Sequence, residues 1–412
     1  MVASGLLTLG LARGLPPSVF AAWTLFLVVV AYANHAHLGL IFGAQQLIPR
    51  LGGPGASGRG RAIHDTAWIA IALPSAAFAL AGSFLWCRST ECGDGILLVA
   101  VGLSLFAQPL LGFVQASLRL KSRFTLMSLI GVISYAGPAL GVALYWLLTR
   151  SITVESAVMS TMVFSIAGLA VASRDIGLPR IFDRSALREV ALQGLGPLAI
   201  GILLILLINV DVWVLQAKLG RAAVGEWGIG LSVLSVSLSG VAAFSNVLYP
   251  TIVREHGTSG PRIELSRWII VLASLSVGWL LFMGLAAGPI LRLVLPSYLA
   301  ALSPAIFLAG VGLQLGLLSF SSNVLLAQRR YVSVAAVFAA AVAANAVVDV
   351  LAVGWGSAVL ALTKLTLVSA LGIVFSILAG PGRPELRSAW LASLSIYVAG
   401  LIAFLLTQAG IS

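Results

Sequence analysis

Apolar residues run along the chain in long blocks that are separated by short polar segments. Thirteen blocks stand out, at about 1–13, 17–42, 64–86, 96–118, 124–148, 155–173, 193–217, 222–252, 268–296, 300–326, 331–352, 356–378 and 389–409. Blocks of about 20 apolar residues are typical of helices that span a membrane, because a helix satisfies its backbone hydrogen bonds internally. The pattern therefore predicts an all-α polytopic membrane protein.

The first block is shorter than the others. At 1.5 Å per residue, its thirteen residues cover roughly 20 Å, whereas the hydrocarbon core of a bilayer is about 30 Å thick. Either the true start of the chain lies upstream, or this helix is a stub that does not cross the membrane.

Composition supports a membrane protein and changes how the charge is interpreted. Of 412 residues, 60% are apolar and 9% are charged, and the mean hydropathy is +1.07, whereas soluble domains are about 25% charged. A net charge of +11 in a soluble protein would indicate nucleic acid. Here the basic residues lie in short loops between blocks, where they orient a membrane protein, so we expect no nucleic-acid partner.

The basic residues are distributed unevenly when the loops are assigned alternately to the two sides. If the loop at 50–64 is cytoplasmic, one side holds Arg50, Arg59, Arg61, Arg119, Lys121, Arg123, Arg174, Arg180, Arg184, Arg188, Arg254, Arg262, Arg267, Arg329, Arg330, Arg383 and Arg387. The other side holds Arg13, Arg88, Arg150, Lys218, Arg221 and Arg292. Because cytoplasmic loops are enriched in Lys and Arg, this predicts a multi-pass protein of the cytoplasmic (inner) membrane with basic loops inside.

The two halves of the chain carry the same pattern. A basic residue, a short turn and a tryptophan follow one another at Arg13 to Trp23 and again at Lys218 to Trp227, at an offset of about 204 residues. Six blocks separate equivalent positions, so the halves point the same way across the membrane. We expect two pseudo-symmetric six-helix lobes, namely an N-terminal lobe over 1–173, a cytoplasmic linker over 174–192, a C-terminal lobe over 193–378, and a linker with an additional helix over 379–412.

The hairpin at 192–257 carries a resemblance to a known family. Its marks are Gly196-Pro197, Asn209-Val210-Asp211, Lys218-Leu219-Gly220, Val224-Gly225-Glu226-Trp227 and Leu248-Tyr249-Pro250. They resemble the seventh and eighth helices of the polysaccharide exporter family, the Wzx-type flippases within the multidrug and oligosaccharidyl-lipid exporter superfamily. The resemblance covers nearly the whole chain through loose motifs that mark turns and packing. It departs from the family at the short first helix and at His37, where many relatives carry an acidic residue.

The resemblance implies a flippase, not an enzyme. Its substrate would be a polyprenyl-pyrophosphate-linked oligosaccharide, moved between leaflets by alternating access, and its partners would be this lipid-linked oligosaccharide, membrane lipids and glycan assembly proteins. A diphosphate with sugars cannot cross hydrocarbon unaided, so the carrier needs a hydrated cavity with hydrogen-bonding groups and a positive field. The alternative is a cation-coupled multidrug or small-molecule exporter, which needs buried carboxylates in the N-terminal lobe. No cofactor is expected.

Five polar residues in the C-terminal lobe are candidates for binding substrate. Asp211 lies within a predicted span, where an ionisable group needs a cavity or a partner, and Asn209 lies beside it. Asn345 and Asp349 are four residues apart and share a helix face. Lys364 lies about eight residues into the next span, within reach of Asp349. These residues either contact a substrate phosphate or form structural pairs.

Polar residues of the N-terminal lobe form a second group. On a helix, His35 and His37 would lie about 200° apart, so we expect one to line the cavity and the other to pack against protein. That spacing does not suit a metal site, which favours histidines three or four apart. Gln108 and Gln115 either bind sugar hydroxyls or bond neighbouring helices. Cys87 and Cys92 lie in one outer loop, where a disulfide is possible.

Two other classes fit the sequence less well. A membrane glycosyltransferase or polymerase needs acidic catalytic residues in sizeable outer loops, whereas the predicted outer loops are about ten residues or fewer and carry only Glu91, Asp94, Glu155 and Glu226. A scaffold without transport activity would be expected to carry appended soluble domains, and the predicted organisation includes none. A transporter therefore remains the favoured interpretation.

Overall fold

The computed structural model describes residues 2–51, 58–91, 94–176, 179–255, 265–327, 330–378 and 384–409. Within these ranges the chain is helical and forms no strand. This confirms the predicted all-α fold.

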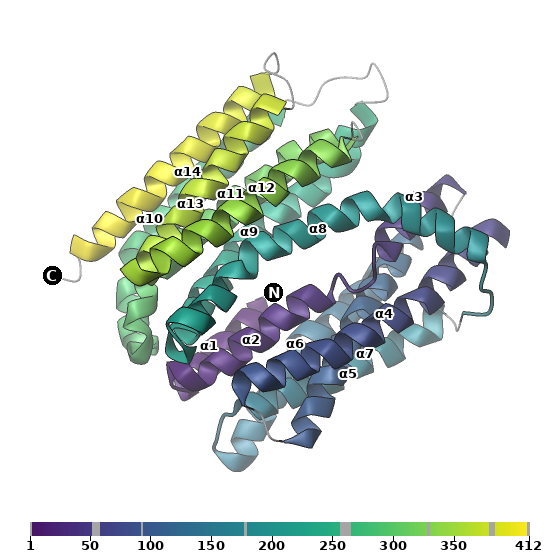
Figure 1. Ribbon diagram of the computed structural model, residues 1–412, viewed down its shortest axis with the longest axis horizontal. Coiled ribbons are helices and arrows are strands. Elements are labelled where there is room, and N and C mark those ends of the chain that lie inside the picture. The colour runs from purple at the N-terminus through teal and green to yellow at the C-terminus, as the bar shows by residue number, and fades with distance from the viewer. Residues whose placement is uncertain are drawn as a thin grey trace. The chain divides into compact units, whose positions relative to one another are not determined.

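The helices follow the predicted apolar blocks in order (Figure 1). They are α1 (Val2–Gly14), α2 (Pro17–Ala33), α3 (Leu40–Arg50), α4 (Gly58–Thr90), α5 (Gly95–Leu120), α6 (Phe124–Thr149), α7 (Val154–Ile176), α8 (Arg184–Lys218), α9 (Arg221–Glu255), α10 (Leu265–Val294), η1 (Pro296–Ala301), α11 (Leu302–Ala327), α12 (Tyr331–Ala352), η2 (Val353–Trp355), α13 (Ser357–Leu378) and α14 (Pro384–Ala409). Among the described residues, eleven helices are long and apolar enough to cross a membrane. The protein is thus a multi-pass membrane protein.

The second apolar block departs from the expectation of one continuous helix. It forms α2 and α3, with a turn over residues 34–39 between them. Leu38 and Gly39 adopt positive φ angles of 49° and 82°, which a continuous right-handed helix does not allow. Glycine tolerates such angles at little cost, so Gly39 is the residue that permits the break.

The chain forms two compact units. The first comprises 1–15 and 22–205, and the second comprises 16–21 and 206–412. The boundary near 205 falls inside α8, because the first half of this helix packs with the first unit and its second half with the second. The lobe and linker boundaries that the sequence gives, with a lobe starting at 193, stay a prediction.

Equivalent contacts within the two units express the internal repeat. In the first unit, the Gln108 amide on α5 donates to the Ser165 hydroxyl on α7, at 3.4 Å. In the second, the Gln314 amide on α11 donates to the Ser369 hydroxyl on α13, at 3.1 Å. Gln108 and Gln314 are about 205 positions apart in the sequence, and so are Ser165 and Ser369. Each unit is therefore built on the same arrangement of a central helix held to a later one by a glutamine.

The cores of both units consist of tightly packed side chains and small residues. In the first unit, one cluster joins α3, α4, α5 and the start of α8 through buried residues that include Ile41, Ile63, Phe113 and Val190. In the second, α11 is the most enclosed span, with 94% of its apolar window buried. Polar residues at such depth need partners within the protein, and these partners define the candidate site.

Candidate functional site

A buried ion pair lies within the second unit. The Lys364 ammonium on α13 donates to Asp211 Oδ2 on α8 and, at 2.8 Å, to the backbone carbonyl of Ile208. Both side chains are fully enclosed, at 0% exposure. Breaking a buried ion pair costs about 3–5 kcal/mol, since the remaining charge has no partner. The pair therefore fastens α13 to the second half of α8.

An amide extends this pair to a second carboxylate. Asn345 Nδ2 on α12 donates to Asp211 Oδ1 at 2.7 Å and to Asp349 Oδ2 at 2.9 Å. Both residues are buried, and Asp349 lies one turn further along α12. Together, Asp211, Asn345, Asp349 and Lys364 are called the ion cluster below. It links three helices of one unit.

The ion cluster corrects the predicted partner of the lysine. We expected Lys364 to pair with Asp349, on the adjoining helix of the hairpin, but its ammonium lies against Asp211 on α8. The physical reason is that α8 offers the ammonium two acceptors, the Asp211 carboxylate and the Ile208 carbonyl. The predicted partner on α12, Asp349, offers only its carboxylate. The expectation that Asn345 and Asp349 share a face is confirmed by their hydrogen bond.

The cluster contains two carboxylates for one ammonium. Asp349 Oδ1 is buried without a hydrogen-bond partner, although buried carboxylate oxygens are normally satisfied. A proton on this oxygen would balance the charge without breaking either bond that Asn345 makes. The cluster is thus a structural tie with the capacity to take up one proton.

The turn between α2 and α3 brings two histidine rings together in the first unit. We expected His35 and His37 to point to different sides of one helix, but the helix is broken here and the ring centroids lie 6.0 Å apart, nearly stacked. The Gly39 N–H donates to His37 Nδ1 at 3.0 Å. His37 also contacts the Phe42 ring edge-on, at 5.1 Å. His37 therefore stabilises the turn that precedes α3, while His35 is less enclosed.

Glycines of α8 make room for this turn. A Cβ atom at Gly194 or Gly39 would overlap the backbone of the other residue, and one at Gly201 would lie 2.7 Å from His35 Nε2. His35 Nδ1 lies 3.4 Å from the Ala31 carbonyl. The backbones of α8 and the turn are thus in direct contact, and the unwound segment is held in place within the first unit.

The remaining sequence candidates lie elsewhere. Gln108 is buried and bonded to Ser165 as described, which matches the helix-bonding alternative. Gln115 is half-buried on α5, and Asn209 is 6% exposed on α8, two residues before Asp211. Cys87 is half-buried, but Cys92 lies outside the described residues. The disulfide stays a prediction.

A polar cluster that the sequence analysis missed joins the linker to α4. Arg59 Nη1 lies 2.7 Å from Asp183 Oδ2, and its Nη2 lies 2.9 Å from Glu189 Oε2. The Asp65 carboxylate accepts from the Arg180 N–H at 3.0 Å, and the Thr66 hydroxyl accepts from the Asp183 N–H at 2.9 Å. A signal was present in the sequence, because the acids Asp183 and Glu189 lie among the basic residues of the linker.

The linker acid also caps α8. The Ser185 hydroxyl and the backbone N–H groups of Ser185 and Ala186 donate to Asp183 Oδ1. These hydrogen bonds, the hydroxyl's first, favour the charged form and hold the pKa of Asp183 below its usual range. Carboxylates at a helix N-terminus are stabilised in this way. The start of α8 therefore belongs structurally to the first unit.

Among the described residues, no three His, Cys, Asp or Glu side chains gather into a group that could hold an ion. The two sites that stand out are thus the ion cluster in the second unit and the His35–His37 turn in the first.

The fold is shared with known membrane transporters. A lipid II flippase in an inward closed conformation aligns over 100% of this chain and 98% of its own, with a TM-score of 0.65 and 12% identity. A multidrug resistance MATE family transporter of the MOP superfamily, in an inward-facing conformation, aligns over 100% and 94%, with a TM-score of 0.54 and 16% identity. A MOP superfamily transporter from Pyrococcus furiosus, described as having a binding pocket of reversed polarity, aligns over 100% and 91%, with a TM-score of 0.50 and 15% identity.

The sequence itself matches no protein-family model and no curated protein. At these identities, the likeness concerns the fold. The chain has the fold of MOP-superfamily transporters, which include a lipid flippase and multidrug exporters.

Proposed function

We propose that the chain flips a polyprenyl-pyrophosphate-linked oligosaccharide, such as an O-antigen or exopolysaccharide repeat unit, across the cytoplasmic membrane by alternating access. The observation that carries the proposal is the His35–His37 turn: a break between the apolar helices α2 and α3 of the first unit that brings two imidazole rings within 6.0 Å of each other. Unwound segments inside transporters are typical places for binding polar ligands. Imidazoles suit a pyrophosphate, because a neutral ring still donates one hydrogen bond to an anionic oxygen.

The carboxylates of the first unit support an anionic substrate. Of its described acidic residues, Asp65 is the buried one, and it is engaged with the linker at the start of α4. An exporter of cations needs a free carboxylate at the depth of the cavity. The first unit offers histidines at that depth instead, which favours a phosphate over a cationic drug.

In this proposal, the two sites have different tasks. The His35–His37 turn contacts the pyrophosphate, and the hydroxyls of the sugars bond to amides such as Gln115. The ion cluster holds α8, α12 and α13 together, so that the second unit keeps its shape through the transport cycle. The basic loops face the cytoplasm, and glycan assembly proteins supply the substrate. No enzymatic step belongs to this function.

Export of a cationic compound is the second candidate function. The observation that favours it is the ion cluster, where the buried Asp349 Oδ1 without a partner can take up a proton. A carboxylate that gains and loses a proton is what proton-coupled export requires. MATE family multidrug transporters also share the fold.

The two functions are separated by one experiment in a strain that lacks the protein. Flipping predicts that lipid-linked oligosaccharide accumulates on the cytoplasmic leaflet and that wild-type protein restores surface glycan. His35→Ala and His37→Ala should each reduce restored glycan about tenfold or more, the effect of losing a hydrogen bond to a charged group. Both variants must be present in the membrane at wild-type levels.

The matched control is His64→Gln. This histidine lies against Asp65 and Ser117 at the linker, away from the turn, so the variant should flip normally. Normal surface glycan in the deletion strain, with raised drug accumulation, would replace flipping by export. Full activity of the His35→Ala/His37→Ala double variant would remove the turn as the substrate site.

A further inference from the structure

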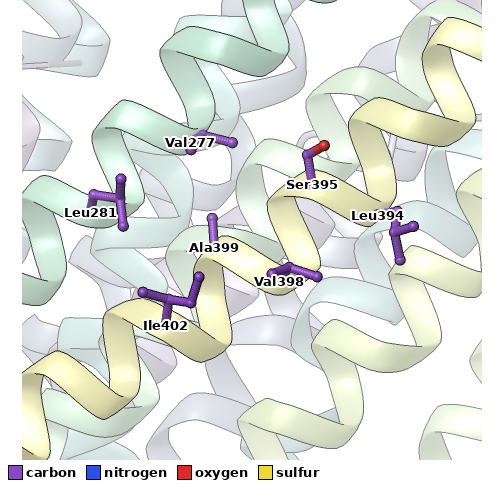
Figure 2. Close-up of a pocket in the computed structure, with 7 residues that line it drawn as sticks. All are labelled: Val277, Leu281, Leu394, Ser395, Val398, Ala399 and Ile402. Atoms are coloured by element: carbon purple, nitrogen blue, oxygen red, sulfur yellow. The ribbon is translucent and has the colours of Figure 1, made fainter.

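An open apolar groove runs beside the contact between α10 and α14, two neighbouring helices of the second unit (Figure 1). Val277 and Leu281 line it from α10, and Leu394, Ser395, Val398, Ala399 and Ile402 line it from α14, as Figure 2 shows. Its volume is about 440 Å³. Sites for small molecules measure about 300–1,000 Å³, so the groove is large enough for a ligand.

A second groove continues the first toward the starts of the two helices. It shares Val277 and Ser395 with the first and adds Ile270, Ala273, Ser274, Ser388, Leu391 and Ala392, with a volume of about 390 Å³. The two form one channel along the pair of helices. It runs from Ile270 and Ser388 at one end to Leu281 and Ile402 at the other.

The channel closes where the two helices touch. A Cβ atom at Gly284 would lie 2.7 Å from Ala403 Cα, and the Thr407 hydroxyl donates to the Gly284 carbonyl at 3.1 Å. No side chain fits between the helices at this level. The channel therefore ends inside the membrane span and is open toward the starts of α10 and α14.

The length of the channel matches one leaflet of a bilayer. From Ile270 to Leu281, a rise of 1.5 Å per residue gives about 17 Å. Half of the hydrocarbon core is about 15 Å thick. A single acyl chain that enters at the membrane surface would extend to the closed end near Gly284.

The wall of the channel suits hydrocarbon and not sugar. Its residues are mostly aliphatic, and the Ser395 hydroxyl is engaged with the Leu391 carbonyl of its own helix at 2.8 Å. A ligand with hydroxyls would lose its hydrogen bonds to water here without replacement. The occupant is therefore apolar over the length of the channel.

The open end of the channel is positively charged. Arg267 is exposed on α10 and lies three residues before Ile270, so it shares the face that lines the channel. Basic residues at this depth attract anionic headgroups by about 1 kcal/mol each.

We propose that the α10–α14 channel binds one anionic phospholipid, with an acyl chain along the channel and the headgroup phosphate at Arg267. The lipid comes from the leaflet on the side where α10 and α14 begin, and it is a bound component separate from the transported substrate. It fills the groove beside the contact between the two helices and so supports the packing of α14 on α10.

Native mass spectrometry of the detergent-purified full chain tests the proposal, with phosphatidylglycerol and phosphatidylcholine as probes. Wild type should retain one phosphatidylglycerol in preference to phosphatidylcholine. Ser395→Phe, which fills the channel from an exposed position, should abolish retention. Arg267→Gln should lower retention about fivefold. The matched controls are Leu293→Phe and Arg292→Gln, exposed residues at the opposite end of α10, and both should behave as wild type.

Two results would overturn the proposal. Ser395→Phe protein that retains phosphatidylglycerol as wild type does, while its melting temperature is unchanged, would exclude the channel as a lipid site. Equal retention of both lipids, insensitive to Arg267→Gln, would exclude the headgroup contact. If Ser395→Phe instead converts a dimer into a monomer with lipid binding intact, the channel holds a second copy of the chain and the proposal fails.

Discussion

The two units are built on one repeat, yet they differ in where buried charged side chains lie. Because Ser165 and Ser369 make equivalent contacts, they align α7 of the first unit with α13 of the second in the repeat. In this alignment, Ser160 is the position equivalent to Lys364. The second unit has a buried ion cluster there, whereas in the first a Cβ at Gly141 would meet the Ser160 side chain. The helices at this position are thus held together by close packing of small residues in the first unit and by an ion pair in the second.

A second difference concerns the helix that contains each tryptophan of the repeat. Trp23 and Trp227 are equivalent in the repeat, but α2 stops at Ala33 while α9 runs unbroken from Arg221 to Glu255. Among the described residues, the unwound backbone with its two histidines lies in the first unit, and the buried lysine–carboxylate pair lies in the second. In the proposed function, this difference makes the first unit the one that contacts a polar ligand and the second the one that its ion pair keeps rigid.

Replacing Lys364 should have the largest effect on this comparison. Lys364→Met leaves the Asp211 carboxylate buried with no cation, which should cost about 3–5 kcal/mol of stability. Ser160→Ala, at the equivalent position of the first unit, should change stability by less than about 0.5 kcal/mol. Thermal unfolding of both purified variants in the same detergent measures the contrast.

A double variant controls for the loss of the side chain itself. Asp211→Asn combined with Lys364→Met removes both charges and keeps an amide that can bond to its neighbours, so most of the lost stability should return. Equal melting temperatures for Lys364→Met and Ser160→Ala would contradict the asymmetry between the units.

The sequence predicts the helices and the repeat because both follow from local pattern. A block of apolar residues in a membrane favours a helix, so the predicted blocks correspond to the observed helices, except that the second is broken between α2 and α3. The tryptophan and basic residues at each turn, such as Lys218 and Trp227, mark equivalent positions without any knowledge of contacts. Pattern also identified the members of the ion cluster, since ionisable residues within spans are costly and therefore few.

The missed features depend on contacts between distant segments. The break at Gly39 requires a backbone contact with Gly194 that no local pattern contains. Likewise, the pairing of Lys364 with Asp211 instead of Asp349 depends on where α8 lies in the folded unit. The linker cluster joins Arg59 to Asp183 across more than a hundred residues. Such pairings follow from three-dimensional packing, not from spacing along the chain.

Replacing Gly39, which permits the break between α2 and α3, should have the second largest effect. Gly39→Ala places a Cβ at a positive φ and 2.6 Å from the Gly194 carbonyl oxygen, which should cost about 1–3 kcal/mol. Gly240→Ala, in the unbroken α9 with nothing within 4 Å of the added Cβ, should stabilise by up to about 1 kcal/mol. Melting temperatures that shift in opposite directions would support the broken and unbroken helices; a stabilising Gly39→Ala would contradict the break.

The two glutamines test the repeat itself with a smaller effect. Gln314 donates to both the Ser369 hydroxyl and, at 2.6 Å, the Ser393 carbonyl, whereas the bond from Gln108 is a single long one to Ser165. Gln314→Leu should therefore destabilise the protein by about 1 kcal/mol and Gln108→Leu by about half as much, within the range for hydrogen bonds between membrane helices. The same unfolding assay measures both. A larger loss for Gln108→Leu would reverse the assigned strengths of the two contacts.

The cap of α8 by Asp183 gives the smallest effect and confines it to the first unit. The hydrogen bonds from Ser185 and Ala186 lower the pKa of Asp183 in the folded protein. A lowered pKa stabilises the fold above the unfolded pKa of about 3.9, and this contribution is lost as the pH falls through the folded pKa. Protection of the Ser185 and Ala186 amides from hydrogen exchange, corrected for intrinsic rates, should therefore decrease below about pH 4.

The control for this pH dependence is a cap that does not titrate. The Ser156 N–H at the start of α7 donates to the Thr153 hydroxyl at 3.1 Å, so its protection should stay constant over the same range. Asp183→Asn should remove the pH dependence at α8 because the amide carries no charge at any pH. Protection at Ser185 that stays unchanged through acidification in wild type would show that the Arg59–Glu189 pair and the Thr66 hydroxyl, rather than the Asp183 carboxylate, hold the linker to the first unit.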